Sequence, residues 1–563
     1  MSENFRGAKQ GLTSYGDTGF SNFLRGVFLA SAGWDATDLE RPIVGIANTE
    51  SDFNPCHRLV PAIIENIKRG VLQAGGVPFV FPTMSLGETL ISPTSMYLRN
   101  LMAMETEEMI RSQPMDAVVL VGGCDKTVPA QAMAAISADV PALLEVVGPM
   151  LTSTWRGERL GACTDCRKMW ASHRSGDVSA DEIVEIGNAL ATTGGTCMVM
   201  GTASTMASLI ETLGLMLPGG ATPPSPTGER LRHATKTGRA AVSLAKEARS
   251  PSSFLSKGSF LNAVTVLAAI GGSTNAIVHL LAMAGRAGID LTLEDMEEIF
   301  VKTPLLLDLK PSGAGYMEDF DRAGGMPQLL LRLHPLLDLE AIDMFGKSLG
   351  EQLSEISTRE DQSTIHTLES PLLPAPTLAV VKGSLAPDGA VIKVSAATSH
   401  LLRHKGPARV FDSADEASKE LSKPNGNFMA DEVLVLRNSG PVGAGMPEAG
   451  AMAIPRNLAE TGIKDILRVS DARMSGTSYG TVVLHCSPEG AVGGPIGLVR
   501  DGDIIELNID TRSLNLLVEE QELDERQRLT PQMEQEPATL SFWRTIFTRH
   551  VTQARLGADM DLS

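Results

Sequence analysis

Residues 117–129 read AVVLVGGCDKTVP, and this stretch decides the fold class. Its first five residues, AVVLV, have the apolar, β-branched character of a buried strand. Two glycines end the strand pattern, and a helical pattern then runs over 127–138, with Pro129 in the first turn, where proline is tolerated. A strand, a glycine turn and a helix in this order predict one unit of a layered α/β domain.

The same alternation continues towards the N-terminus. The runs at 42–47 (PIVGIA) and 79–81 predict two further strands, and the apolar periodicity of 60–74 predicts an amphipathic helix between them. Alternating strands and helices predict a mainly parallel sheet covered by helices. Ligands of such sheets bind beyond the carboxyl ends of the strands, so we expect a functional site in the loops that follow these strands.

A second domain is predicted after a polar and then proline-rich segment, TREDQSTIHTLESPLLPAP, at 358–376. After it, short apolar runs separated by Gly, Pro and Asp turns indicate closely spaced strands. These runs lie at 378–382, 390–394, 408–411, 433–436, 466–469, 481–484 and 504–509. We therefore predict an α/β domain over 1–365 and a β-rich, barrel-like domain over 375–563.

The charge balance limits the classes of partner. The 563 residues carry a formal net charge of −19, which disfavours nucleic acid as a partner because phosphates require a basic surface. Residues 1–26 show no apolar core of signal-peptide length, and no apolar run approaches the roughly 20 residues of a membrane helix. We expect a soluble, cytoplasmic protein without a membrane partner. A small anionic substrate would need local positive charge, which a bound metal ion would supply.

The six cysteines are too sparse to predict a disulfide framework. For any one of them, the role of a small buried apolar residue is the ordinary expectation. Three of them, however, lie in separate turns, two of which open helices, where a thiolate is favoured. These are Cys56 in NPCH, Cys124 in GGCDK and Cys197 in GGTCMVMG. Most iron–sulfur clusters take four cysteines, so three would leave one iron position open for a substrate.

The remaining cysteines have weaker signals. Cys163 and Cys166 form CTDC, whose spacing is typical of zinc and redox sites. No second CxxC completes a four-ligand site, so a structural role is slightly favoured. Cys486 lies in the strand pattern VVLHCS and is predicted to pack in the core. The adjacent Cys56 and His57 are by themselves only a weak metal signal.

Carboxylate and hydroxyl side chains complete the candidate set. Asp125 follows Cys124 directly, and a soft thiolate beside a hard carboxylate could serve two different metals. Glu88 lies in SLGETL and Glu448 in the glycine-rich GPVGAGMPEAG, although a solvated loop position is the ordinary expectation for each alone. Ser475 lies in DARMSGT and would act as a base only if a nearby cation stabilised its alkoxide.

Taken in order, these motifs resemble the dihydroxy-acid dehydratase and phosphogluconate dehydratase family, which includes the sugar-acid (aldonate) dehydratases. The resemblance covers nearly the whole chain. It runs from RPIVGIANTESDFNPCH through GGCDKTVPA, GACTDC, GGTCMVMGTASTM and GGSTNAIVHL to LAPDGAVIK, GPVGAGMPEAG, SDARMSGTSYGTVVLH and AVGGPIGLVRDGD. It implies an α/β domain joined to a β-rich domain, in homodimers or homotetramers.

The resemblance also implies roles for individual residues. The family's [2Fe-2S] cluster cysteines match Cys56, Cys124 and Cys197. Its Mg²⁺ ligands match Glu88, Asp125 and Glu448, and the lysine that is carbamylated in several members matches Lys126. The proposed catalytic base matches Ser475, and Thr477 lies beside it.

The implied reaction removes water from a 2,3-dihydroxy carboxylic acid to leave a 2-keto acid. Mg²⁺ would bind the substrate carboxylate and 2-hydroxyl, Ser475 would take the C2 proton, and the open cluster iron would assist loss of the 3-hydroxyl. The contexts of Glu88 and Ser475 look more like those of sugar-acid dehydratases, so an aldonate is the expected substrate. The alternatives are a dihydroxy-acid dehydratase of branched-chain amino-acid synthesis and a non-catalytic metal or redox protein that uses Cys163 and Cys166.

Overall fold

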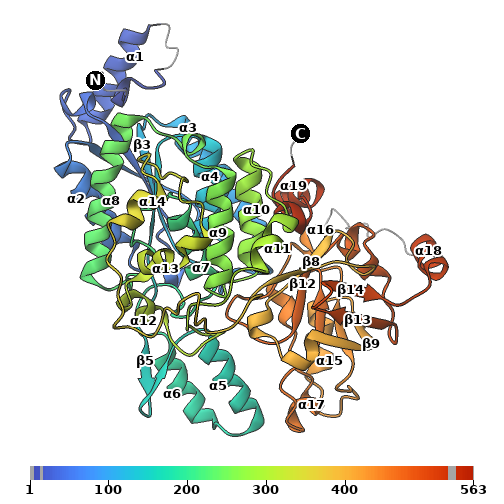
Figure 1. The fold of residues 1–563 in the computed structure, drawn as a ribbon. Coiled ribbons are helices and arrows are strands. Elements are labelled where there is room, and N and C mark those ends of the chain that lie inside the picture. The colour runs from blue at the N-terminus through green and yellow to red at the C-terminus, as the bar shows by residue number, and fades with distance from the viewer. Residues whose placement is uncertain (1–4, 13–16, 530–540, 562–563) are drawn as a thin grey trace.

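The computed structural model describes residues 5–12, 17–529 and 541–561. Two large sheets organise the chain, one in each half (Figure 1). The first sheet has four strands in the order β2-β1-β3-β4, and all neighbouring strands are parallel. This confirms the parallel sheet that the alternating pattern predicts. Its strands are β1 (Ile43–Asn48), β2 (Val77–Pro82), β3 (Ala117–Gly122) and β4 (Ala142–Val146).

Two of the helices beside this sheet, α2 (Val60–Gln73) and α8 (Gly228–Glu247), pack against each other with very close backbones. A Cβ atom on Gly70 would lie 2.1 Å from the carbonyl oxygen of Thr235, and one on Gly238 would lie 2.2 Å from that of Ile67. Glycine is therefore required at both contact points. Elsewhere on α2, large apolar side chains pack into the core. Ile63 and Ile67 are fully buried, as the periodicity of 60–74 predicts.

The other helices of this half surround the sheet or extend from it. Helices α5 and α6 project from the body as a hairpin, next to the short β5–β6 ribbon (Ser153–Trp155 and Glu158–Leu160) (Figure 1). Among the described residues, no helix is both long enough and apolar enough to cross a membrane. The helices are α1 (Thr18–Ala30), α3 (Met96–Ser112), α4 (Thr127–Ala138), α5 (Thr164–Ser175), α6 (Ala180–Leu190), α7 (Thr202–Thr212), α9 (Lys257–Ala269), α10 (Asn275–Arg286), α11 (Leu293–Phe300), α12 (Met317–Arg322), α13 (Gly325–Leu333) and α14 (Leu349–Ser354).

The second half contains an eight-stranded mixed sheet in the order β14-β13-β9-β10-β11-β12-β8-β7. Strands β9 to β12 are parallel, whereas the outer strands pair antiparallel. Every strand run predicted after residue 376 coincides with one of these strands. They are β7 (Ala379–Val381), β8 (Gly389–Ile392), β9 (Arg403–Phe411), β10 (Val433–Leu436), β11 (Arg468–Ser470), β12 (Val482–Ser487), β13 (Ile504–Asn508) and β14 (Ser513–Leu516). Short helices α15 (Ala414–Leu421), α16 (Pro441–Ala444) and α17 (Arg456–Glu460) connect them.

The two edge strands of this sheet meet, which makes it a nearly closed barrel. Lys382, just after β7, donates its backbone N–H to the carbonyl of Arg512 at 2.9 Å and accepts one from Leu514 at 2.9 Å. Closure of this kind satisfies backbone groups that an open edge would expose. Buried apolar side chains such as Val435 and Ile505 fill the barrel core, so the predicted β-rich, barrel-like domain is confirmed.

The two halves are joined by more than the connecting segment. Residues 365–373 run beside 305–309 of the first half through isolated bridges, so the segment lies against that half, and the limits at 365 and 375 stay a prediction. Beyond α18 (Glu520–Leu529), helix α19 (Phe542–His550) returns towards the first half. There the buried Arg99 donates to the carbonyls of Gly557 and Ala558 at 2.9 and 2.7 Å, and Asp559 accepts from Arg286 at 2.6 Å.

A buried lysine in the barrel generates a prediction about stability. Lys393 is only 1% exposed and its Nζ makes no hydrogen bond within the described residues. Burial lowers the pKa of Lys393 to about 7, so the unfolded chain binds more protons than the fold between this pH and about 10.5. Titration of Lys393 therefore makes the free energy of unfolding rise with pH across this range.

We expect Lys393→Met to stabilise the protein at pH 7 by about 1–3 kcal/mol, because it removes an unpaired buried amine. The advantage over the wild type should shrink as pH rises towards 9.5, because the folded amine is already neutral there and deprotonating the unfolded amine costs less as pH approaches its pKa of about 10.5. Thermal unfolding of the two proteins across pH 6.5–9.5 measures this. Melting curves that shift with pH in parallel would contradict the assignment.

Candidate active site

Five of the six predicted site residues of the first half lie in three loops at one edge of the parallel sheet, and the sixth, Cys197, precedes α7 (Thr202–Thr212). These loops follow β1, β2 and β3 at their carboxyl ends, where ligands of parallel sheets bind. They carry Cys56 after β1, Glu88 after β2, and Cys124, Asp125 and Lys126 after β3. Lys126 is the last residue before α4, so the turn predicted from GGCDKTVP is confirmed.

His57 fastens two of these loops together. Its Nδ1 donates to the carbonyl of Thr49 at 2.8 Å, and its Nε2 accepts the backbone N–H of Gly123 at 2.8 Å. Burial lowers the pKa of His57, which keeps the ring neutral, as this pattern of one donor and one acceptor requires. His57 therefore acts as a brace that holds the Cys56 turn beside the Cys124 turn.

Five of the six cysteines form a continuous group, which the sequence divides among four motifs. Cys56 and Cys124 are hydrogen-bonded to each other, and the backbone N–H of Glu88 points to the Cys124 Sγ at 3.5 Å. On the other side, the Sγ atoms of Cys197 and Cys163 lie 3.0 Å apart, and Cys163 also contacts Cys166. Cys56 interacts electrostatically with Cys163 and Cys197, which links the two sides. Cys486 is buried in the barrel core, as predicted.

The thiols of Cys56 and Cys197 are held in their protonated form. The hydrogen bond with Cys124, followed by burial, raises the pKa of Cys56 well above its usual value. For Cys197, a hydrogen bond with Cys163 lowers the pKa, but burial and the neighbouring acidic groups outweigh it and raise the pKa overall. A metal that binds these sulfurs must therefore displace protons, so its affinity increases with pH.

Arg473 joins the carboxylates of the two halves. Its Nη2 donates to Glu88 Oε1 at 2.7 Å, its Nη1 to Glu448 Oε1 at 2.5 Å, and its Nε to the carbonyl of Met446 at 2.8 Å. Glu88 also accepts from Lys126 Nζ at 3.3 Å and from the hydroxyl of Ser95. Arg473 is 1% exposed, so this bridge is a buried ion-pair network.

The charges in this network shift the carboxyl groups in opposite directions. Burial alone would raise the pKa of Glu88, but the charges of Lys126 and Arg473 outweigh it and hold that pKa well below its usual range. Burial raises the pKa of Asp125 to about 6 despite the opposing charge of Lys126, with Glu88 and Glu448 adding to the rise. The three carboxylates are thus close enough to repel one another, and two cations compensate them.

Ser475 and Thr477 come from the loop after β11 and reach the first half. Their hydroxyl oxygens lie 2.9 Å apart, and the Thr477 carbonyl accepts from the hydroxyl of Thr164 at 3.3 Å. The turn between them fits only with glycine, because a Cβ on Gly476 would lie 2.6 Å from the Cβ of Ser273. The predicted base therefore sits between the CTDC loop and the segment that precedes α10.

The GGSTN segment at 271–275 supports this turn. The hydroxyls of Ser273 and Thr202 lie 2.9 Å apart, and Asn275 Nδ2 donates to the Thr202 hydroxyl at 3.0 Å. The backbone N–H of Ser273 donates to Thr205 at 3.1 Å. These contacts tie the start of α10 to the start of α7, which follows Cys197, so the segment has a structural role.

The donors sort by chemical type. The thiols interact with one another, Glu88 and Glu448 both pair with Arg473, and Asp125 interacts with both groups. Soft thiolates suit iron–sulfur clusters, and an oxygen-only set suits Mg²⁺. In the described part of the chain, no three His, Cys, Asp or Glu side chains converge closely enough to enclose a single ion. Neither group needs such a cage, because a cluster spreads its ligands over more than one iron and Mg²⁺ commonly keeps waters and substrate oxygens.

Contacts and electrostatic interactions connect seven of the nine residues that the sequence singled out, and Ser475 and Thr477 join them only through Thr164, the neighbour of Cys163. Two further residues, Arg473 and Thr164, were missed. Arg473 lies in the quoted DARMSGT motif, and an arginine two positions before a candidate base was an available signal. The proximity of Cys163 to Cys197 and the link from Thr164 to Thr477 depend on tertiary structure, and the sequence carries no local signal for them.

Comparisons with known proteins match both halves of the chain to one family. The family model described as "Dihydroxy-acid/6-phosphogluconate dehydratase N-terminal" matches residues 41–352, and the corresponding C-terminal model matches residues 363–558. The 6-deoxy-6-sulfo-D-gluconate dehydratase of Pseudomonas putida is 44% identical over 525 residues, covering 92% of this chain and 90% of the relative.

Two other relatives represent the branches of the family. The L-arabinonate dehydratase of Rhizobium leguminosarum bv. trifolii is 42% identical over 524 residues, covering 92% of this chain and 90% of the relative. The dihydroxy-acid dehydratase of Caldanaerobacter subterraneus subsp. tengcongensis is 36% identical over 539 residues, covering 94% and 96%. Both matched halves and the site between them lead to one conclusion: the chain belongs to the dihydroxy-acid/6-phosphogluconate dehydratase family.

Proposed function

We propose that this protein is a sugar-acid dehydratase, which converts an aldonate to a 2-keto-3-deoxy acid. The observation that carries the proposal is the position of Ser475, whose turn contacts the cysteine-bearing loop of the first half through Thr164 and Thr477. The similarity to relatives supports the substrate class, because the sulfogluconate and L-arabinonate dehydratases are 44% and 42% identical, whereas the dihydroxy-acid dehydratase is 36% identical.

The local charge suits an anionic hydroxy acid. The chain carries a net charge of −19, which repels anions at long range. At the site, however, the cations of Lys126 and Arg473 lie among the carboxylates of Glu88 and Glu448. A substrate carboxylate therefore meets local positive charge here, and more of it once a cation is bound.

In this proposal, the thiol and carboxylate side chains of the site would hold two cofactors. Cys56, Cys124 and Cys197 would hold a [2Fe-2S] cluster, and Glu88, Asp125 and Glu448 would hold Mg²⁺. Lys126, if carbamylated, would add a further carboxylate-like ligand. When bound, these metals supply Lewis-acid polarisation of the substrate's carboxylate and hydroxyl oxygens.

The chain's own residues would move the proton. Ser475 Oγ accepts the C2 proton of the substrate, and loss of that proton with the 3-hydroxyl leaves an enol that tautomerises to the 2-keto acid. The Thr477 hydroxyl, 2.9 Å from Ser475 Oγ, and the Thr477 backbone N–H, 3.4 Å away, orient that oxygen and stabilise its negative charge. Ser475 is 9% exposed, so bulk water competes little for it.

Two alternative functions would use these residues differently. A dihydroxy-acid dehydratase would use the same residues on a branched substrate, and it remains the second candidate because relatives with that name match 94% of the chain at 36% identity. A separate metal or redox protein built on Cys163 and Cys166 is disfavoured, since Cys163 contacts Cys197 of the same site. A homodimer or homotetramer and a cytoplasmic location stay predictions.

The proposal is tested by measuring 2-keto acid formation with anaerobically reconstituted protein and Mg²⁺. The panel contains L-arabinonate, D-xylonate, D-gluconate and 2,3-dihydroxyisovalerate. Faster turnover of an aldonate supports the proposal. Preference for 2,3-dihydroxyisovalerate would move the protein to the second candidate, and absence of product from every acid, with iron and sulfide bound, would overturn both.

The role of Ser475 makes a second prediction. Ser475→Ala should lower kcat on the preferred acid by roughly 10²–10⁴-fold, because it removes the group that takes the C2 proton. Iron and sulfide per chain, measured by chemical analysis, should equal those of the wild type. Ser513→Ala, in the edge strand β14 of the same half, is the matched control and should keep its activity. Full activity of Ser475→Ala would remove the serine from the mechanism.

The proposed Mg²⁺ ligands can be tested without turnover. Mg²⁺ that binds the fold raises its melting temperature once its concentration exceeds the Kd, because the stabilisation grows as RT ln(1 + [Mg²⁺]/Kd). Asp125→Asn should move the onset of this rise to Mg²⁺ concentrations at least about 10-fold higher, since it removes a ligand charge. Glu65→Gln, an exposed change on α2, is the control. Superimposable Mg²⁺ titrations of Asp125→Asn and the wild type would exclude Asp125 as a ligand.

A further inference from the structure

The loop that carries Glu448, residues 439–448 (the Glu448 loop), is held at its start by a buried carboxylate from outside it. Glu489 is 1% exposed. Its Oε1 accepts the backbone N–H of Val442 at 2.9 Å, and its Oε2 accepts that of Gly443 at 2.9 Å. These two hydrogen bonds fix the first turn of the loop on the Glu489 carboxylate.

Glu489 is itself held by an amide from the end of the chain. Gln553 Oε1 accepts the backbone N–H of Glu489 at 2.9 Å, and Gln553 Nε2 donates to Glu489 Oε1 at 2.8 Å. Gln553 therefore fixes both the backbone and the side chain of Glu489. All three groups that reach the carboxylate in these contacts are N–H donors, which suits an ionised carboxylate because it only accepts.

The segment that carries Gln553, residues 541–561 (the C-terminal segment), is anchored on the first half of the chain. Trp543 Nε1 donates to the carbonyl of Tyr97 at 2.6 Å, and Asn100 Nδ2 donates to the carbonyl of Ala558 at 3.0 Å. Figure 1 shows α19 of this segment beside α16, the short helix at the start of the Glu448 loop. The C-terminal segment thus connects the first half to the loop that carries Glu448.

The far end of the Glu448 loop is also held in place. Met446 is fully buried in an apolar cluster with Phe547 and Val551 of the C-terminal segment. Its φ of 55° is uncommon for a residue other than glycine, so its surroundings must hold this conformation. Arg473 Nε donates to the Met446 carbonyl at 2.8 Å. Glu448, two residues further on, therefore projects from a loop that is fixed on both sides.

We propose that Glu489 and Gln553 act as one unit of positioning residues that holds Glu448 where a bound Mg²⁺ requires it. This inference rests on the proposed function, which assigns Glu448 to Mg²⁺. The two residues act through the backbone of the Glu448 loop. Partners that orient a metal ligand in this way typically change metal affinity by about 10–100-fold when they are mutated.

Two physical effects would make the affinity depend on this unit. A loop that is already ordered loses less conformational entropy when the ion binds, so less of the binding free energy is spent on ordering it. Asp125 interacts electrostatically with Glu448, so a shift of the loop changes the separation of two proposed ligands that come from different halves. The end of the chain would thereby control how tightly the site binds Mg²⁺.

The test compares Gln553→Ala with Arg555→Ala, a matched change on the same segment that breaks an exposed ion pair with Asp388 instead. Mn²⁺ is the probe, because it takes the same oxygen ligands as Mg²⁺. Anaerobically reconstituted proteins are titrated with Mn²⁺, and free Mn²⁺ is measured by EPR. We expect Gln553→Ala to raise the Kd for Mn²⁺ by about 10-fold. Arg555→Ala should match the wild type, and Mg²⁺ should displace the bound Mn²⁺.

A double variant tests whether the two residues act as one unit. Glu489→Gln places an amide N–H₂ against groups that donate, so it should also weaken Mn²⁺ binding by at least about 10-fold. Adding Gln553→Ala to it should cost little more, because residues in one network are not additive. Additive losses would overturn the inference. If Glu489→Gln does not fold, the comparison of Gln553→Ala with Arg555→Ala decides alone.

A merely structural role would give a different result. Gln553→Ala would then lower the melting temperature of the metal-free protein and leave the Kd for Mn²⁺ unchanged, and this outcome overturns the inference. Glu448→Gln is the reference, because Glu448 is an assigned ligand. Weaker Mn²⁺ binding by Glu448→Gln with unchanged binding by Gln553→Ala would remove only the positioning role. A wild type that binds no Mn²⁺ and forms no 2-keto acid from any acid of the panel would overturn the proposed function as well.

Discussion

The buried guanidinium of Arg473 is the interaction on which the site depends. It donates to Glu88 from the first half and to Glu448 from the second, and both carboxylates would otherwise face each other. Removing one partner from a buried ion pair costs about 3–5 kcal/mol, because the remaining charge is left without compensation. The guanidinium thus ties the barrel half to the loop after β2 of the parallel sheet, two residues from Ser475.

Around this bridge, the chain separates soft donors from hard ones within very few residues. Cys124 and Asp125 are consecutive, yet the thiol belongs to the sulfur group and the carboxyl to the oxygen group. His57 holds two sulfur-bearing turns together by neutral hydrogen bonds and leaves neither ring nitrogen for a metal. Two kinds of metal site can therefore stand side by side, which is what a reaction that activates two oxygens of one substrate requires.

Local sequence patterns predicted many of the strands. The runs at 42–47 and 117–121 predict β1 and β3, and the seven runs after 376 all coincide with barrel strands, because buried strands concentrate β-branched residues. The parallel core of the barrel and the helices α15 and α17 within it were not predicted, since short helices leave little periodicity.

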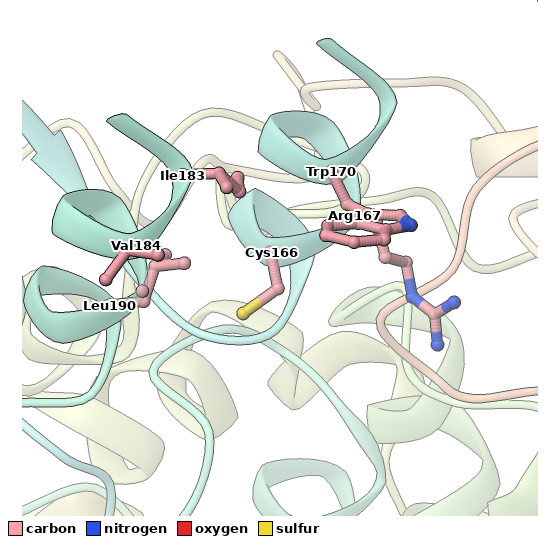
Figure 2. Close-up of a pocket in the computed structure, with 7 residues that line it drawn as sticks. Cys166, Arg167, Trp170, Ile183, Val184 and Leu190 are labelled. Atoms are coloured by element: carbon pink, nitrogen blue, oxygen red, sulfur yellow. The ribbon is translucent and has the colours of Figure 1, made fainter. Parts of the chain in front are cut away.

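For the site, the motifs indicated which residues are special but not how they meet. Arg473 looks like any charged loop residue until Glu88, 385 positions away, is placed beside it. Cys163 and Cys166 have the spacing of a metal or redox pair in the sequence. In the structure, Cys166 lines a surface pocket (Figure 2), whereas Cys163 contacts Cys197. Such contacts between distant segments are fixed by tertiary packing, and no window of sequence contains them.

The proposed function requires that the two halves build one site, in which cysteines of the first half hold iron within reach of a serine from the second. Anomalous diffraction at the iron absorption edge, from crystals of anaerobically reconstituted protein, tests it most directly. The proposed function predicts an anomalous peak bounded by Cys56, Cys124 and Cys197, on the side that faces Ser475. An iron peak elsewhere, in a protein that turns over an aldonate, would contradict it.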